Sequence, residues 1–351
     1  MKEYIFLIAV SLLLMMSACV KVKTSRDFPP LRDGAVVELT ASEIAWLEQI
    51  AKEKRDSIRI ADSITAAGGN ADPNSLFHKT GLIVALVEVN DHYFPNVLCF
   101  KDENGKPVID LAFPFSANIN IDPGTGKAYV YYNQQHQEML RDKIFTRVKN
   151  GGVPIGLSIL GNHDAAGWSN FRNLGEATDF ARKVAFEVRR NGFSAVLSDD
   201  EYSDYQPGAD PNSYLMAMSE IKRLLPDIYL CYYPLGTGGG SWNGKKMGEI
   251  ADACFPDYGQ PIETGLDFNF PKKGCFQSFN GWAPGTNEAR QIKDQGYGGV
   301  MIFNLGGSAP TILNGVAAGL KGKQVSVESG CLDGRAYDFV NTRNPDGTPR
   351  W

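Results

Sequence analysis

The sequence predicts an α/β protein whose main part is a (β/α)8 barrel, the TIM barrel fold. Eight apolar runs of strand length follow residue 80, and helical patterns separate several of them. Strands that are buried on both faces read as continuous apolar runs, and their alternation with helices indicates parallel β–α units. Eight such units fit the length of a closed barrel, which is roughly 250 residues.

The eight runs occupy the chain from residue 80 to about residue 305. In chain order they are 81–89, 108–119, 153–160, 193–198, 228–235, 252–258, 274–280 and 298–305. Helical patterns lie between some of them, as at 176–191 and 211–225. An open doubly wound sheet is the alternative, but no GxGxxG motif follows the first run. We therefore expect the barrel.

Composition describes an ordinary globular protein and excludes some partners. The chain has 351 residues, of which 43% are hydrophobic and 21% charged, and its net charge is -5 without a basic block. These values argue against a nucleic-acid partner. The four histidines lack the spacing of a metal site, so no metal ion or other cofactor is expected.

The cysteines beyond the N-terminal segment are widely spaced and form no CxxC pair. They are Cys99, Cys231, Cys254, Cys275 and Cys331. Because most of them lie in or beside apolar runs, we expect small core residues rather than disulfides or metal ligands.

The N-terminus reads as a targeting segment. Lys2 precedes an apolar run over 4–16, which is short for a membrane span. The run ends in "MSAC", which resembles a bacterial lipobox and predicts cleavage before Cys19 and lipidation of its thiol. A plain signal peptide that contains a cysteine is the alternative. We expect a protein anchored by lipid in the cell envelope, facing the periplasm or the surface, with no other membrane contact.

Four segments follow from these patterns. They are a lipoprotein signal peptide (1–18), a tether with an N-terminal helix (19–75), the barrel (76–330) and a C-terminal tail (331–351). In the helix, apolar residues recur three and four apart until about residue 66, and Thr40 or Ser42 is the expected N-cap. We expect the protein to be a monomer.

Polar residues gather where the strands end, and in a TIM barrel the carboxyl ends of the strands carry the active site. In chain order these residues include Asn118, Asn162, His163, Asp199, Asp200, Glu201, Asp257, Tyr258, Gln277, Asn280 and Asn304. One acidic turn could be a solvated loop, whereas polar ends on six strands predict a site at the mouth of the barrel.

The acids of the fourth run, in "FSAVLSDDEYSDY", are the first candidates for chemistry. Residues two apart on a strand face the same side, so Asp199 and Glu201 should face the mouth and Asp200 should face away. Two close carboxylates do not ionise together, so one should hold a proton near neutral pH, as a general acid must. Glu201 would donate the proton, and Asp199 would orient a polar group or stabilise positive charge. A divalent-cation site and a structural acid pair are the alternatives.

The segment "AVLSDDEYSDY" also resembles the "DGVDFDDEY" strand of family 18 glycoside hydrolases, in particular of the endo-β-N-acetylglucosaminidases related to endoglycosidase H. The pattern of that family is DxxDxDxE. Further matches to this group are "FSANINID", "GLSILGNHDAAGWSNF", "FPDYG" and "GYGGVMIFNL", in the same order, over about residues 80–320. The resemblance implies an enzyme that hydrolyses the GlcNAc-β1,4-GlcNAc bond in the chitobiose core of N-linked glycans, by a retaining, substrate-assisted mechanism.

The resemblance also implies roles for individual residues. Glu201 would protonate the leaving oxygen and then activate water, Asp199 would hold the acetamido N–H of the substrate, and Tyr258 would donate to the acetamido carbonyl. Candidate contacts to the N-glycan or glycoprotein substrate are Asn118, Asn162, His163, Tyr202, Gln277, Asn280 and Asn304.

Two positions depart from the family pattern. Ser194 and Leu197 occupy the places of its first two aspartates. Since the second of these normally shares a proton with the next aspartate, Leu197 should let Asp199 ionise more easily. The departures leave open a glycan-binding surface protein with weak or no activity. A chitinase is the less favoured enzyme, because the matching loops are of the endoglycosidase type.

Overall fold

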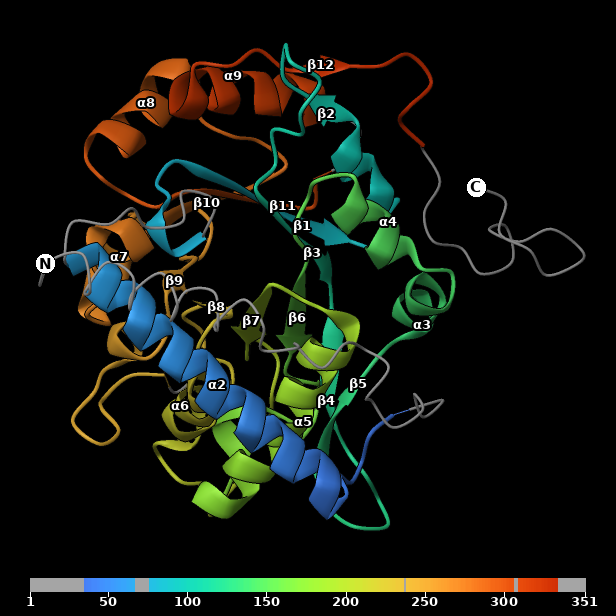
Figure 1. Cartoon of the computed structure of the whole chain (residues 1–351), viewed down its shortest axis with the longest axis vertical. Coiled ribbons are helices and arrows are strands. Elements are labelled where there is room, and N and C mark those ends of the chain that lie inside the picture. Colours follow the sequence, from blue (N-terminus) through green and yellow to red (C-terminus); the bar gives the residue numbers. More distant parts are fainter. Residues whose placement is uncertain (1–34, 67–75, 237, 306–308, 334–351) are drawn as a thin grey trace, which may run out of the picture. The chain divides into compact units, whose positions relative to one another are not determined.

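A computed structural model describes residues 35–66, 76–236, 238–305 and 309–333 (Figure 1). The expected signal peptide, Cys19 and most of the expected tail lie outside the described residues. In the described ranges, every helix is too short or too polar to cross a lipid bilayer.

Eight parallel strands form the centre of the molecule, and each lies within one of the eight predicted runs, except that β7 extends one residue beyond its run, to Asp199. They are β1 (Leu82–Glu88), β3 (Leu111–Phe115), β6 (Gly156–Leu160), β7 (Ala195–Asp199), β8 (Tyr229–Tyr232), β9 (Ala253–Cys254), β10 (Phe276–Asn280) and β11 (Gly299–Phe303). Ladder partners pair in parallel, as in β10–β11–β1–β3 and β6–β7–β8–β9. The predicted strands are confirmed.

The strands belong to two sheets rather than to one continuous ladder, so the fold is TIM-barrel-like. Only single parallel bridges, Ala112 to Ile155 and Cys254 to Cys275, join the sheets on their two sides. On one side the second predicted run is divided. Its first half is β3, and its second half continues as β4 (Ala117–Ile121), which pairs with β6 instead. On the other side β9 is only two residues long. The expected uninterrupted closure is therefore not formed.

The split strand also carries a hairpin that the sequence did not suggest. Strand β4 pairs in antiparallel with β5 (Ala128–Tyr131). Asp122 stabilises the turn between them, because its Oδ1 accepts hydrogen bonds from the backbone N–H groups of Gly124 and Thr125, at 3.1 and 2.8 Å.

Helices cover the outside of the strands only in part. They are α3 (Gln134–Arg141), α4 (Ile144–Asn150), α5 (Leu174–Asn191), α6 (Ser213–Leu224), α7 (Thr264–Asp267), α8 (Thr286–Asp294) and α9 (Ala309–Lys321). Helices α5 and α6 pack on each other, as do α8 and α9 (Figure 1). The connections β1–β3, β8–β9 and β9–β10 contain only short helical turns or the short strand β2 (Phe100–Lys101), so the expected alternation is incomplete there.

The predicted N-terminal helix is confirmed as α2 (Ala41–Ala66). Thr40 caps it: its Oγ1 accepts from the backbone N–H of Glu43 at 3.3 Å, and the Glu43 carboxylate accepts from the N–H of Thr40 at 2.6 Å. The first half packs on α5 and α6 through its buried face, which includes Leu47. Glu48 adds a bidentate pair with Arg223 of α6, at 2.6 and 2.9 Å.

The expectation that none of these cysteines forms a disulfide is wrong for one pair. Cys99 and Cys331 form a disulfide across 232 residues of sequence, next to the antiparallel pair of β2 and β12 (Ser326–Val327). Neither spacing nor composition signals such a pair, because only the fold brings the two ends together. Cys231, Cys254 and Cys275 are free and buried, as expected of small core residues.

Candidate active site

Strand β7 carries its residues alternately into the barrel and outward, which places Asp199. Ala195 and Leu197 belong to the apolar cluster inside the barrel. Asp199 is the next residue on that face, at the carboxyl end of the strand, and it is 4% exposed. The expectation that Asp199 faces the mouth is confirmed by this register.

Asp200 lies on the outer face of the strand end and joins two loops. Its side chain is 1% exposed. It accepts hydrogen bonds from the backbone N–H groups of Trp168 and Ser169, at 2.9 and 3.0 Å, and from the Ser203 hydroxyl at 2.6 Å. Asp200 thus faces away from the mouth as expected, but it holds the loop after β6 against the turn after β7.

Glu201 lies beyond the strand, because β7 ends at Asp199. The expectation that both acids are strand residues is therefore wrong for Glu201. The turn still keeps the two acids together: the backbone N–H of Glu201 donates to Oδ1 of Asp199 at 3.1 Å. Glu201 is exposed, whereas Asp199 is buried.

The environment of Asp199 raises its pKa to about 8. Burial is the largest cause, because it disfavours the charged carboxylate, and the nearby negative charge of Glu201 is the second. The prediction that one acid of the pair holds a proton near neutral pH is supported. Leu197 is 1% exposed and belongs to the apolar interior, and that it lets Asp199 ionise more easily than the aspartate of the family pattern would stays a prediction.

Tyr258 follows β9 and lies close to both acids. Burial raises the pKa of its hydroxyl, and the charges of Asp199 and Glu201 are the next causes. Its ring lies 5.7 Å from that of Phe303 at the end of β11, centroid to centroid. Its backbone N–H donates to Asp257 at 2.7 Å. The structure thus brings together the three residues that were predicted to be catalytic.

Tyr233 is a residue of this site that the sequence analysis missed. It follows β8 on the inward face, after Tyr229 and Cys231 in the interior cluster, and its hydroxyl donates to Asp257 at 2.7 Å. The same Asp257 oxygen accepts from the backbone of Tyr258, so Tyr233 helps to position the Tyr258 loop. The signal in the sequence was the alternation of inward-facing residues along the run 228–235, which places Tyr233 on the same face as Tyr229 and Cys231.

Tyr202 and His163 meet beside Glu201. Their rings are stacked, with centroids 4.6 Å apart and an interplanar angle of 13°. The pKa of the Tyr202 hydroxyl is raised, first by partial burial and then by its hydrogen bond to Glu201. Asn162, on the same loop as His163, donates to Asn120 at 3.2 Å. These predicted contact residues therefore border the acid pair.

The remaining predicted contacts are spread around the strand ends. Asn118 is half-buried on β4, and Asn280 ends β10. Asn304 follows β11 with a positive φ of 52°, and its buried Oδ1 has no hydrogen-bond partner among the described residues. Gln277 departs from its expected place at the mouth. Since Phe276 belongs to the interior, Gln277 lies on the outer face, where its amide donates to the carbonyl of Gln260 at 2.8 Å.

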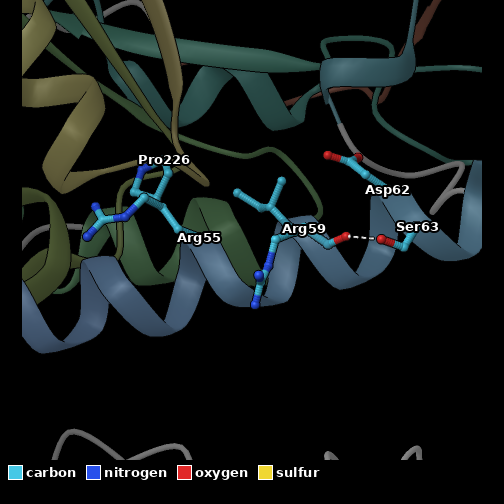
Figure 2. A pocket seen from close by; sticks show the side chains of 6 residues that line it. Arg55, Arg59, Asp62, Ser63 and Pro226 are labelled. Carbon is cyan, nitrogen blue, oxygen red and sulfur yellow. Dashed lines mark hydrogen bonds between the residues drawn. The ribbon is translucent and has the colours of Figure 1, made fainter.

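Neither Asp199 nor Glu201 lines either of the two cavities described in the structure. One, of about 550 Å³, follows the exposed side of α2 and is lined by Arg55, Ile58, Arg59, Asp62, Ser63 and Pro226 (Figure 2). None of the candidate catalytic residues lines it, so it is not the active site. The other, of about 460 Å³, borders the loop that follows Tyr258. In the part of the chain that the structure covers, no three His, Cys, Asp or Glu side chains are grouped as a metal site would require.

The chemistry that this arrangement supports is acid–base catalysis. Such catalysis needs a carboxyl that carries a proton at working pH and a neighbouring group that can exchange it. Asp199 and Glu201 provide both at the mouth of a TIM-barrel-like fold, and the hydroxyl of Tyr258 lies close enough for their charges to raise its pKa. Together with the relatives described next, these features define a glycoside hydrolase.

Comparison with known proteins shows the family. No family model matches the sequence. The chain is 31% identical over 260 residues to endo-β-N-acetylglucosaminidase F1 of Elizabethkingia meningoseptica, covering 68% of this chain and 76% of that protein. It is 30% identical over 236 residues to an endo-β-N-acetylglucosaminidase of a Flavobacterium species, covering 63% and 74% respectively. The chain therefore belongs to the endo-β-N-acetylglucosaminidases of glycoside hydrolase family 18.

A solved structure agrees with this assignment. EndoBT-3987 of Bacteroides thetaiotaomicron, in complex with a Man9GlcNAc2Asn substrate, is 27% identical with a TM-score of 0.64, covering 72% of this chain and 68% of that chain. The same protein with a Man5GlcNAc product is 28% identical with a TM-score of 0.63, and 64% of that chain is covered.

Proposed function

We propose that the protein hydrolyses the GlcNAc-β1,4-GlcNAc bond in the chitobiose core of N-linked glycans, with retention of configuration. The observation that carries the proposal is the raised pKa of buried Asp199 beside Glu201, with Tyr258 close to both. The relatives support the substrate class, because two of them are endo-β-N-acetylglucosaminidases and the structurally similar EndoBT-3987 is bound to a Man9GlcNAc2Asn substrate.

The pair of acids holds the single proton that the reaction needs. Near neutral pH this proton resides on Asp199, because its pKa is about 8. Transfer of the proton to Glu201 produces the reactive form, which has an acidic Glu201 and an anionic Asp199. Glu201 then protonates the leaving glycosidic oxygen. The carbonyl oxygen of the substrate acetamido group attacks the anomeric carbon, the glycosidic C–O bond breaks, and the protonated oxygen departs as a hydroxyl group of the leaving sugar.

The second half of the reaction reverses these proton movements. Anionic Asp199 holds the acetamido N–H and offsets the positive charge of the cyclic intermediate. In the first half of the reaction, Tyr258 donates to the acetamido oxygen before this oxygen attacks the anomeric carbon. Glu201, now a carboxylate, accepts a proton from water as the water oxygen bonds to the anomeric carbon, and the bond from that carbon to the acetamido oxygen breaks, which restores the acetamido carbonyl. The proton returns to the pair, and the product keeps its original anomeric configuration.

Leu197 supports a second candidate function, a surface glycan-binding protein of the same family. The family pattern has an aspartate at this place, whereas here an apolar side chain fills the barrel interior. The deciding experiment is incubation with a labelled N-glycoprotein and mass analysis of both products. Hydrolysis leaves one GlcNAc on the protein and releases the rest of the glycan. A bound but intact glycan would support the binding protein instead.

Tyr258→Phe tests the acetamido contact. We expect a turnover about 10²-fold lower, the scale of one hydrogen-bond donor to a transition state. The ring packing on Phe303 should survive, because phenylalanine keeps the aromatic ring. Single-turnover rates on a glycopeptide would measure the effect, and an unchanged rate would show that the hydroxyl takes no part.

We also propose that the protein is exported, lipidated at Cys19 and displayed as a monomer in the cell envelope. The disulfide between Cys99 and Cys331 supports export, since such bonds persist in oxidising compartments. Cys19→Ala should move the protein from the membrane fraction to the soluble fraction. Cys231→Ala, which changes a buried thiol, is the control and should leave the distribution as in the wild type. Membrane partitioning of the Cys19→Ala protein would contradict lipidation.

A further inference from the structure

The cavity of about 460 Å³ beside the candidate active site has the lining of a carbohydrate subsite. Its size lies in the range of small-molecule sites, about 300–1,000 Å³. The walls come from the loop after β9, the outer face and following turn of β10, and one face of α8. On α8, Glu288, Gln291 and Ile292 follow helical spacing, and Gln295 is the C-cap of the helix, so that a single face of the helix and its end border the cavity.

An exposed indole provides the apolar surface of this cavity. Trp282 is 56% exposed. Among the large hydrophobic residues of the described chain, only Tyr205 is as exposed, and none is more exposed. Its ring is held edge-to-face against buried Phe279, with centroids 4.7 Å apart and an angle of 78°. A fixed aromatic face open to solvent suits the C–H face of a pyranose ring.

The polar groups of the cavity suit an uncharged ligand. The lining contains no lysine, arginine or histidine, so it does not favour phosphates or acidic sugars. Its one carboxylate, Glu288, already accepts the backbone N–H of Gly285 at 3.1 Å. The side-chain amides of Gln291 and Gln295 make no hydrogen bond within the described ranges, and each can both donate to and accept from sugar hydroxyls.

The cavity also shares structure with the catalytic mouth. Gly259 to Ile262, which form one wall, directly follow Tyr258, and Gln277 holds this loop through the carbonyl of Gln260 at 2.8 Å. Trp282 lies two residues after Asn280, whose neighbour across the ladder is Phe303. Two walls of the cavity therefore continue directly from segments that end at the mouth.

We propose that this cavity is a second carbohydrate subsite, in which a pyranose ring from an outer branch of the glycan substrate stacks on Trp282 and hydrogen-bonds with Gln291 and Gln295. The proposal rests on the proposed function for its substrate. In this proposal the cavity recognises an outer branch of the glycan, whereas the active site recognises the bond that is cut.

The test compares branched and trimmed substrates. High-mannose and complex-type glycopeptides are each compared with a glycopeptide trimmed to the trimannosyl core. For whichever branched peptide the wild type cleaves, Trp282→Ala should raise KM about tenfold, or about 1.4 kcal/mol, with kcat unchanged. The trimmed peptide should show no change, Trp282→Tyr should restore most of the affinity, and Gln291→Ala should reproduce part of the loss. Ile60→Ala removes a side chain of similar exposure, 52%, on α2 and should have no effect.

Direct binding separates this proposal from the proposed activity. The heat of binding is titrated with α1,2-mannobiose and with N-acetyllactosamine, which end high-mannose and complex branches. Saturable binding of either sugar to Glu201→Gln protein, lost on adding Trp282→Ala, supports the subsite even if no glycopeptide is cleaved. Binding without any KM difference between branched and trimmed substrates would overturn the assignment to the substrate branch. An effect of Trp282→Ala only on intact glycoproteins would indicate a protein contact, and absence of both effects would refute the subsite.

Discussion

Glu201→Gln is expected to lower glycan release by at least about 10²–10⁴-fold, the usual contribution of a general acid–base group. Glutamine keeps the size and hydrogen bonding of glutamate but cannot give up a proton. Because Glu201 is exposed and beyond the end of β7, the fold should tolerate the change. Release of labelled glycan measured over hours would give the rate, and titration with an uncleaved glycopeptide would give the affinity.

Binding and chemistry should separate in this variant. The affinity for glycopeptide should stay near that of the wild type, since the other groups at the mouth are unchanged. If wild type and Glu201→Gln bind glycan equally and release it at the same negligible rate, the protein is a glycan-binding member of its family. If both release glycan at the same fast rate, another residue is the acid.

Asp199→Asn should give the second large effect: it should lower the turnover and, as the pH rises, increase the free energy of unfolding relative to the wild type. Turnover should fall by about 10²-fold or more, because an amide cannot become the anion that offsets positive charge on the intermediate. In the wild type, activity should also fall above about pH 8, as the acid pair loses its proton near the pKa of Asp199. A pH profile of kcat/KM would show this fall in the wild type.

The stability effect follows from the same raised pKa. Asp199 titrates near pH 8 in the folded protein and near its ordinary value of 3.8 when unfolded, so between these values the folded state binds the extra proton. The free energy of unfolding contributed by this group is therefore present below about pH 4 and is lost as the pH rises through about 8. The full loss corresponds to roughly 6 kcal/mol at about 1.4 kcal/mol per pKa unit.

Asparagine at this position does not titrate, so Asp199→Asn should gain stability over the wild type as the pH rises. Urea unfolding at pH 5 and pH 9 would show a small difference at the first and the largest gain at the second. Asp200→Asn is the matched control on the opposite face of the strand end. It should weaken the fold at both pH values, by about 1–3 kcal/mol, because its carboxylate accepts three hydrogen bonds. If the two variants changed the free energy of unfolding in the same way at both pH values, the register of β7 would be contradicted.

Local pattern was enough to predict the strands and the direction of two of the acids. The eight runs became eight parallel strands because continuous apolar runs are stable only when both faces are buried. Alternation along β7 predicted that Asp199 faces inward and Asp200 outward, since this period is a property of the backbone. The family resemblance rested on the same segment, and the relatives confirm it at the level of the family.

Other features depend on contacts between segments that are far apart in sequence, and only the tertiary structure decided them. Burial is the largest cause of the raised pKa of Asp199, ahead of the nearby charge of Glu201, and the spacing of the acids could predict only the second of these. The bond between Cys99 and Cys331 requires two segments 232 residues apart in the sequence to meet. Gln277 and Trp282 line a cavity whose walls come from two loops and a helix. Desolvation and cavity shape arise from atoms that folding brings together, so no local pattern in the sequence encodes them.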